Sequence, residues 1–450
     1  MQSRRRPRQL QCFASPFQHG THHRSPKSHI HLRGLEFAHY GSGHIRQAIY
    51  INGGDFNLIE DCHFHHNVVA ISLKRTADFN TIQHCTFDDS PLQEWNWEAV
   101  KTGGVSYEGG AVTVYASNLA NKGNVIRFNT IRNQFDGANL YSGNLDGPTQ
   151  NMDFHDNDIT DCRDDAIETD GAGSNVRIYR NRLEGFLTGI SVAPCAIGTT
   201  YIMRNILLDW HDVDDYGGYP FKFNVNSSLP IRWVYLYHNT CHTNHAAQNG
   251  FLFKGYSNWS DIVSRNNIDS GTRYAMESWS ETNPVSFDFD NLFTTDSARF
   301  AAWGRVNAGS FEAFQSLSNQ ETNGLSIDPH FVDSPNGILT LRPNSPLIDA
   351  GVRIPGVNEN FLGESPDIGV SEFALSPQTI SISEEGILTS WFVTPGSTYQ
   401  LERSTDLKPR TWLALGEPFV PLEISPPLLD PSPPDGKAFY RLVQLLPTSR

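Results

Sequence analysis

Apolar and polar residues alternate in short runs along most of this chain, and the runs return at a regular interval. Two examples are Ala70-Ile71-Ser72-Leu73-Lys74 and Gly189-Ile190-Ser191-Val192-Ala193, in which the second and fourth residues are apolar. This is the period of a β-strand with one buried face, so the third and fifth side chains are expected to point outward. Segments rich in Gly, Asn, Asp, Ser and Pro, typical of turns, separate the runs. The pattern predicts an all-β chain.

A second repeated phrase has an asparagine at its centre and an apolar residue two positions later. It occurs at Asn129, Asn157, Asn181, Asn205, Asn239 and Asn266. Intervals of 24 to 34 residues are typical of a solenoid whose coils stack on one another. We extend the column backward to Cys85, Cys62 and Gly34 and forward to Asn291, which gives about ten coils. A buried asparagine column satisfies its own polar groups between coils, so we expect it to be structural.

Three regions follow from where this repeat begins and ends. Residues 29–375 are expected to form the coils and their terminal wrap. Residues 376–450 have short alternating strands and Pro-rich turns, which predict a small β-sandwich of the immunoglobulin or fibronectin kind. Residues 1–28 are expected to be irregular. Because the repeat is already running at residue 29 without a capping element, we expect the chain to begin inside a longer, secreted protein.

Charge and cysteine usage narrow the function further. The 450-residue chain has a formal net charge of -15, which argues against a general nucleic-acid-binding protein, since phosphate binding needs a basic face. Its six cysteines are scattered without the spacing of a zinc site, so we expect buried free thiols. No stretch has the apolar length of a membrane span. Histidines gather at His63, His65 and His66 and again around His238, where we expect structural or surface roles.

The repeat resembles the right-handed parallel β-helix, or pectin-lyase-like, superfamily. The residues that carry the resemblance are the asparagine column and two closing phrases, Ser345–Gly351 (SPLIDAG) and Pro366–Phe373 (PDIGVSEF). The resemblance implies a right-handed, single-stranded parallel β-helix in a secreted or cell-surface protein, which we expect to be a monomer. The superfamily includes polysaccharide lyases, glycoside hydrolases and phage tailspikes, so the resemblance does not choose the reaction.

Stacking the alternating runs in register builds two outward columns, because equivalent residues of neighbouring parallel strands lie about 4.8 Å apart. The first column contains Tyr50, Ser72, Thr113, Asn139, Glu168, Ser191, Lys222 and Leu252. The second column contains Asn52, Lys74, Tyr115, Tyr141, Asp170, Ala193, Asn224 and Lys254. Rings, amides, acids and lysines side by side suit a carbohydrate, so we expect a polysaccharide partner. The expected substrate-binding residues are Tyr115, Asn139, Tyr141, Lys222, Asn224, Lys254 and, from an insertion, His211.

Two insertions interrupt the period, and insertions in a solenoid often lie over its binding face. They are residues 88–110, with Trp95, Trp97 and Tyr107, and residues 208–219, with Trp210, His211 and Tyr216. We expect His211 to reach a substrate bound at the outward columns. For Trp210 and Tyr216 two interpretations stay open, namely contact with the substrate and an apolar plug.

The densest acidic segment supplies the candidate catalytic residues. Glu168 and Asp170 are expected outward on one face, about 7 Å apart, while Asp164 and Asp165 are expected in the turn that enters this strand. Paired carboxylates are the acid and base of glycoside hydrolases, at a spacing that here allows inversion or retention. We therefore predict a glycoside hydrolase that uses these four residues and requires no cofactor. An acidic turn without catalytic function is the alternative.

A second interpretation uses the same face for lyase chemistry on a uronate polymer. Asn139, Glu168 and Asp170 present oxygen ligands that suit Ca²⁺. In the alginate and chondroitin lyases of this superfamily, an asparagine and two acids similarly hold calcium. Their lysine is absent here, since Gly173-Ser174-Asn175 stands in its place, and Lys222 would have to be a base with a lowered pKa. A third interpretation is a surface protein that binds glycans without cleaving them.

Overall fold

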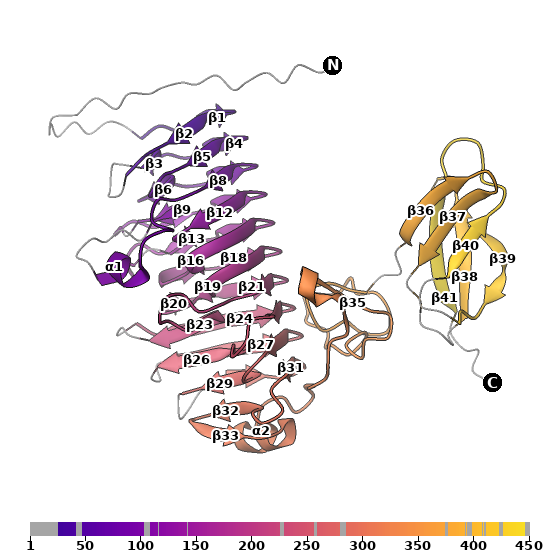
Figure 1. Ribbon diagram of the computed structural model, residues 1–450. Coiled ribbons are helices and arrows are strands. Elements are labelled where there is room, and N and C mark those ends of the chain that lie inside the picture. Colours follow the sequence, from indigo (N-terminus) through magenta and orange to yellow (C-terminus); the bar gives the residue numbers. More distant parts are fainter. Residues whose placement is uncertain are drawn as a thin grey trace. The chain divides into compact units, whose positions relative to one another are not determined.

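The structure is a computed structural model of the whole chain (Figure 1). It describes residues 26–41, 47–102, 109–115, 117–141, 143–225, 229–255, 259–279, 285–373, 377–391, 393, 398–406, 408, 411–422 and 426–445. Most of the segment expected to be irregular, residues 1–28, lies outside these ranges, as does Tyr107. The chain divides into two compact units, Met1–Asp328 with Ile368–Val370 and Pro329–Asp367 with Ser371–Arg450. The domain boundaries expected at residues 29 and 376 stay a prediction.

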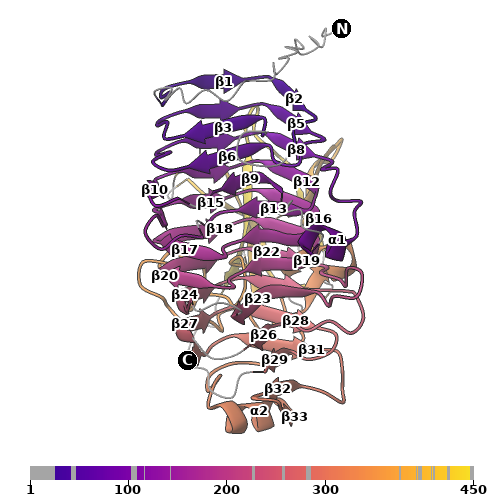
Figure 2. The same cartoon turned by 90° about the vertical axis from the view of Figure 1, so that its left-hand side faces the viewer.

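The first unit is a parallel β-solenoid of about nine turns, which confirms the predicted fold class. One sheet contains β1 (His31–Arg33), β4 (Leu58–Glu60), β7 (Thr81–Gln83), β11 (Val125–Arg127), β15 (Asp153–His155), β18 (Val176–Tyr179), β21 (Thr200–Met203), β24 (Ile231–Tyr237), β27 (Trp259–Arg265) and β30 (Val285–Phe287). A short sheet contains β10 (Asn121–Lys122), β14 (Thr149–Gln150), β17 (Gly171–Ser174) and β20 (Cys195–Ile197). Figure 2 shows these coils stacked one above another.

The largest sheet of the solenoid consists of two rows of parallel strands. The first row contains β2 (Glu36–Ala38), β5 (His63–His65), β8 (Thr86–Asp88), β12 (Thr130–Gln134), β22 (Ile206–Leu208), β25 (Thr240–His242), β28 (Ile268–Gly271) and β31 (Asn291–Thr294). The second row contains β3 (Ile49–Asn52), β6 (Ile71–Lys74), β9 (Gly110–Val114), β13 (Asp136–Asn139), β23 (Tyr219–Val225), β26 (Leu252–Gly255), β29 (Met276–Ser278) and β32 (Ala301–Trp303). Two long strands, β16 (Asp158–Glu168) and β19 (Arg182–Ser191), belong to both rows and join them.

The asparagine column is buried and connects successive coils, as predicted. In Asn181, Oδ1 accepts hydrogen bonds from the backbone and side-chain nitrogens of Asn157, and Nδ2 donates to Asn205 Oδ1 and to the Phe154 carbonyl. The residue before each ladder asparagine has a left-handed backbone, with a φ of 53° at Arg180. This bend turns the chain from one sheet to the next.

Three positions of the predicted column are wrong by one residue. The ladder residues are Asn267 instead of Asn266 and Asp290 instead of Asn291, because Asn239 donates to Asn267 and Asn267 to Asp290. At the other end, Leu35 stands in the column, since Glu36 pairs with His63, and Gly34 precedes it. Gly34 and Asn266 have φ values of 65° and 59°. Glycine and asparagine tolerate that bend, and both therefore occupy the position before the ladder.

A second, shorter asparagine column was not predicted. Asn57 donates to Asn80 Oδ1, and Asn80 donates to Asn124 Oδ1, through both backbone and side-chain nitrogens. All three are buried. This column runs over fewer coils, so its repeat is harder to recognise in the sequence.

Two helices accompany the solenoid. Helix α1 (Trp97–Thr102) lies in the first insertion, beside β16 in both views (Figures 1 and 2). Helix α2 (Phe311–Ser318) is capped by Ser310, whose side chain accepts a hydrogen bond from the Ala313 backbone N–H. Its Phe314 packs against Trp303, near β33 (Val306–Ala308). Among the described residues, no helix has the length and apolar character needed to cross a membrane.

The second unit contains small antiparallel sheets that fit a β-sandwich. They are β34 (Phe331–Asp333) with β35 (Ile338–Leu341), beside the short helix η1 (Ser334–Asn336), then β36 (Pro377–Ser383), β37 (Gly386–Trp391) and β40 (Pro427–Asp430), and finally β38 (Thr398–Ser404), β39 (Leu413–Phe419) and β41 (Phe439–Leu445). Trp391, Tyr399 and Leu442 form a shared buried core. Arg403 on β38 pairs with buried Asp430 on β40 at 2.7 Å and so connects two of the sheets.

Candidate acid–lysine site

The predicted register of the first outward column is confirmed across the solenoid. Asn139 pairs with Glu168, Glu168 with Ser191, and Ser191 with Lys222. The column therefore brings an amide, an acid, a hydroxyl and a lysine onto four successive strands, β13, β16, β19 and β23, although more than eighty positions separate Asn139 from Lys222. The four acids predicted to be catalytic lie together at these strands.

Five carboxylates and two lysines gather at these strands, and we name them the acid–lysine cluster. Its members are Asp136, Asp164, Asp165, Glu168, Asp170, Lys101 and Lys222. Oxygens of Asp165, Glu168 and Asp170 all lie within 4.8 Å of one another, and so do oxygens of Asp136, Asp164 and Asp165. Asp165 belongs to both groups and therefore lies at the centre.

Lys222 neutralises the central acid. Its Nζ lies 2.7 Å from Asp165 Oδ2 and 3.1 Å from Asp165 Oδ1, and 4.0 Å from Asp170 Oδ2. The Asp165 side chain is 1% exposed and that of Lys222 is 16% exposed, so the pair has little contact with water. An ion pair this far from solvent is strongly coupled, since solvent screens it weakly.

Lys101 supplies the second positive charge, and it comes from outside the coils. It lies on α1 in the first insertion, and its Nζ is 2.6 Å from Asp164 Oδ2. The same ammonium group lies 5.6 Å from the centre of the Trp97 ring and 5.8 Å from that of Phe135. The insertion thus adds a second ammonium group to the one that Lys222 supplies from β23.

The acids nearest the surface are held by neutral donors. Asn139 Nδ2 donates to Glu168 Oε2 at 2.7 Å. Asp170 Oδ1 accepts from Ser191 Oγ at 2.5 Å and from the Ala193 backbone at 2.9 Å. The Asp170 side chain is 20% exposed, against 3% for Asp164 and 1% for Asp165. Of these aspartates, Asp170 is therefore the one that a ligand could reach most easily.

Burial and crowding of like charges make the cluster hold protons. Burial, opposed by Lys222, raises the pKa of Asp165 to about 7, and burial also raises the pKa of Asp170. The pKa of Asp136 lies well above its usual range because of burial and the nearby Asp164. Burial opposes the charge on Lys222, but Asp165, Asp170 and Asp164 outweigh it and raise the Lys222 pKa. Five acids facing two ammonium groups cannot all be ionised cheaply in such a site.

Two expectations for the acids change in the structure. Asp164 and Asp165 do not lie in a turn, because β16 continues through them to Glu168 with an irregularity between Cys162 and Asp165. Asp136 was not predicted, although it precedes Asn139 by the three positions that separate Asp165 from Glu168. Its Oδ1 accepts from the Asp165 backbone at 3.3 Å. Extending the register by those three positions would have found it.

Tyr141 does not point outward, contrary to the prediction. It is 1% exposed, and its hydroxyl lies 2.5 Å from Thr200 Oγ1. Strand β13 ends at Asn139, so the alternation on which the prediction depended no longer applies two residues later. The ring fills the space beside Gly173, where a Cβ would lie 2.3 Å from it. A tyrosine buried in this way cannot stack on a sugar.

The other predicted binding residues lie in different settings. Tyr115 is half-buried, and burial raises its phenol pKa, with Ser72 partly offsetting this. Asn224 and Lys254 lie on β23 and β26, but their side chains are outside the described part of the structure. The His211 ring lies 5.4 Å from that of His245, and its Nδ1 faces the Asp209 carbonyl at 3.3 Å. No contact between His211 and a member of the cluster occurs among the contacts described.

The two insertions contact each other next to the cluster. Asp214 Oδ2 accepts from the Trp97 backbone at 2.7 Å, and Asp214 Oδ1 lies 3.0 Å from Arg163. The Tyr216 hydroxyl donates to Glu98 at 2.5 Å, and its ring lies 3.9 Å from that of Trp97. Tyr216 thus packs at the surface between the insertions. Trp210 is fully buried, which matches the plug interpretation for that residue.

A calcium ion at Asn139, Glu168 and Asp170 stays a prediction. Oxygen ligands are present, and Asn139 Oδ1 is buried with no hydrogen-bond partner in the described structure. However, Asn139 turns its nitrogen towards Glu168, and the Lys222 ammonium already provides positive charge beside Asp170. An ion held between Asn139 and Glu168 would require the Asn139 amide to turn over.

Comparison with protein families finds no matching family model, and comparison with curated proteins finds no match. The fold is compatible with carbohydrate-active β-helix proteins. What the site does must therefore be argued from its own geometry.

Proposed function

We propose that this chain hydrolyses glycosidic bonds of a polysaccharide, with Glu168 and Asp170 as its catalytic residues. The observation that carries the proposal is the group of carboxylate oxygens of Asp165, Glu168 and Asp170 within 4.8 Å. Burial raises the pKa of Asp165 to about 7 and also raises that of Asp170, so the group can supply both a protonated and an ionised carboxyl to one bond.

The environment of each acid suggests its role. Asp170 is the most exposed of the cluster's aspartates, and burial raises its pKa, so it is suited to protonate the leaving oxygen. Glu168, held by Asn139, would act from the same face. The close oxygen spacing is nearer to the roughly 5–5.5 Å of retaining enzymes than to the 6.5–9.5 Å of inverting ones, which favours Glu168 as nucleophile. Asp164 and Asp165 are positioning residues in this scheme, because they hold Lys101 and Lys222.

The uronate-lyase alternative fits less well. It needs an unprotonated lysine to remove a proton from the sugar ring, whereas Asp165, Asp170 and Asp164 raise the pKa of Lys222. A lysine that acts as a base needs a lowered pKa, and the pKa of Lys222 is raised. We also propose that the protein acts as a monomer, outside the cell or on its surface, where polysaccharides are available as substrates.

The test is incubation of the full chain with a panel of neutral and uronic polysaccharides. New reducing ends without the ultraviolet absorbance of unsaturated uronates would support hydrolysis, and both signals together would indicate a lyase. Glu168→Gln and Asp170→Asn should abolish the activity. Glu184→Gln is the matched control, because Glu184 lies on β19 with its side chain 40% exposed and outside the cluster. Full activity in both cluster variants, or binding of a glycan without any cleavage, would overturn the proposal.

A further inference from the structure

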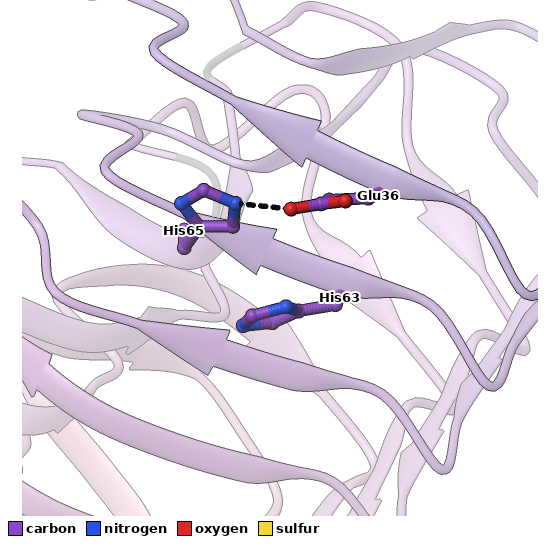
Figure 3. Close-up of side chains that lie close together, drawn as sticks. All are labelled: Glu36, His63 and His65. Atoms are coloured by element: carbon purple, nitrogen blue, oxygen red, sulfur yellow. Dashed lines mark hydrogen bonds and ion pairs between the residues drawn. The ribbon is translucent and has the colours of Figure 1, made fainter. Parts of the chain in front are cut away.

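Another group of side chains that could hold a metal ion lies on the first coils, distant in sequence from the acid–lysine cluster. Glu36 on β2 and His63 and His65 on β5 each offer a ligand atom, and these atoms lie within 4.8 Å of one another (Figure 3). Glu36 pairs with His63 across the two strands, and His65 lies two residues beyond His63 on the same face. We infer that these three residues bind a divalent transition-metal ion, with Zn²⁺ as the best fit.

The backbone under the site is fixed by the core. Phe64, between the two histidines, is 1% exposed and points into the solenoid. Its ring stacks on Phe37 of β2 at 4.9 Å and on Phe87 of β8 at 4.8 Å. Because alternate residues of a strand face opposite sides, anchoring Phe64 inward holds His63 and His65 outward together. The ligands are thus carried by strands rather than by a loop.

Each histidine also has a partner that orients its ring. His63 Nε2 lies 3.0 Å from Asp88 Oδ2 on β8, which leaves its Nδ1 for a metal. His65 Nδ1 lies 2.9 Å from His66 Nδ1, and His65 Nε2 faces Glu36 Oε1 at 2.9 Å, the contact drawn in Figure 3. Metal-binding histidines usually have the second ring nitrogen bound to such a partner.

The hydrogen bonds show how a metal ion could enter. An ionised Glu36 only accepts, so His65 must donate from Nε2 to it and accept at Nδ1 from His66. In the other tautomer His65 carries its proton on Nδ1 and donates it in the hydrogen bond to His66, so the lone pair of His65 Nε2 faces Glu36. A metal ion can then occupy the place between His65 Nε2 and Glu36 that the proton held in the first tautomer. Both tautomers satisfy the contact between His65 and His66.

The donor set selects the kind of metal. Two imidazole nitrogens and one carboxylate suit Zn²⁺ and related transition metals, whereas Ca²⁺ and Mg²⁺ prefer oxygen ligands alone. Three protein ligands also leave a coordination position open. The side chains of Glu36, His63 and His65 are 30%, 47% and 20% exposed, so an ion has access and the ligands can close the small distance to it.

The test is Zn²⁺ titration of the full chain after removal of metal with a chelator. Calorimetry should show one tight equivalent that excess Ca²⁺ does not displace. His63→Ala and His65→Ala should each weaken binding by more than about tenfold. His31→Ala is the matched control, since His31 is also exposed and bonded to a glutamate, Glu60, but lies on a different sheet. Its Zn²⁺ affinity should equal that of the unaltered chain.

Co²⁺ substitution gives a second readout. The visible spectrum should show nitrogen and oxygen ligands in a site of low coordination number, and Glu36→Gln should alter that spectrum while the circular dichroism stays unchanged. The inference fails if no Zn²⁺ binds, or if the affinity survives both histidine substitutions. Competition by Ca²⁺ would equally contradict it, because that would assign the ion to an all-oxygen site.

Discussion

The asparagine column and the acid–lysine cluster are both polar, largely buried and carried mainly by successive coils, yet they differ in charge. In the column, each amide donates to and accepts from its neighbours, so every added coil satisfies the one before it. In the cluster, five acids face two lysines. A neutral column adds stability with each coil, whereas a charged cluster retains protons and depends on pH.

The difference between the column and the cluster is tested most strongly by removing Lys222, the cation beside Asp165. Lys222→Met should lower the free energy of unfolding by about 3 kcal/mol at neutral pH, because Asp165 would be left buried without a partner. Urea unfolding measures the effect. The double variant Asp165→Asn with Lys222→Met should recover part of the lost stability. If Lys222→Met is as stable as the unaltered chain, Asp165 and Lys222 do not form an ion pair that matters for stability.

The equivalent change in the neutral column should have a smaller effect. Asn181→Ala should cost about 2 kcal/mol, since it removes the acceptor of the buried Asn157 backbone N–H and the side-chain hydrogen bonds to Asn205 and Phe154. Asn118→Ala is the control, because Asn118 is exposed. Urea unfolding should separate the two variants clearly, and equal stabilities would mean that the column is not a stabilising element.

The pH dependence of stability should differ in sign between the cluster and the surface. The pKa of Asp165 is raised to about 7 in the folded chain, so folding takes up a proton, and this residue's contribution falls as pH rises from about 4 to about 7. Asp165→Asn should make that fall shallower, by about 1.4 kcal/mol for each unit by which folding raises the pKa of Asp165. Thermal unfolding of both proteins across this range tests it, and parallel curves would contradict the raised pKa.

The smallest effect is expected at a surface ion pair. Arg180 lowers the pKa of Asp156, so this pair contributes stability above the pKa that Asp156 has when unfolded and loses it as pH falls. The Arg180 side chain is 53% exposed, and Arg180→Gln should cost less than about 1 kcal/mol. Added salt should reduce the difference further. A larger, salt-independent loss would place this pair with the buried cluster.

The fold class and the register between coils were predicted best, because both follow from the periodicity of the sequence. Alternation and the asparagine phrase gave the β-solenoid and the register that joins Asn139, Glu168 and Lys222. They failed where the strand stops, as at Tyr141, and where a strand continues through an expected turn, as at Asp165. Periodicity describes a regular strand and carries no information on where its regularity ends.

Other parts of the site had no periodic signal at all. Lys101 lies in an insertion, and its position beside Asp164 depends on how that insertion folds back on the coils. The contact between Asp214 and Trp97 joins two insertions 117 positions apart in the sequence. Such contacts are set by tertiary packing, so a local pattern could not reveal them. The reaction and the substrate stay predictions, because the fold alone does not determine them.

Because most of the acid–lysine cluster lies on a short block of coils around β16 and β19, the number of coils elsewhere in the solenoid could change during evolution. Most of the acid–lysine cluster depends on four consecutive coils, those of β13, β16, β19 and β23. Whole coils could therefore be gained or lost outside these four coils without changing the distances within the cluster. The contact between Lys101 of α1 and Asp164 would have to be kept. Solenoid length and site chemistry are separable properties, so the number of coils could change without a change in the acid–lysine cluster.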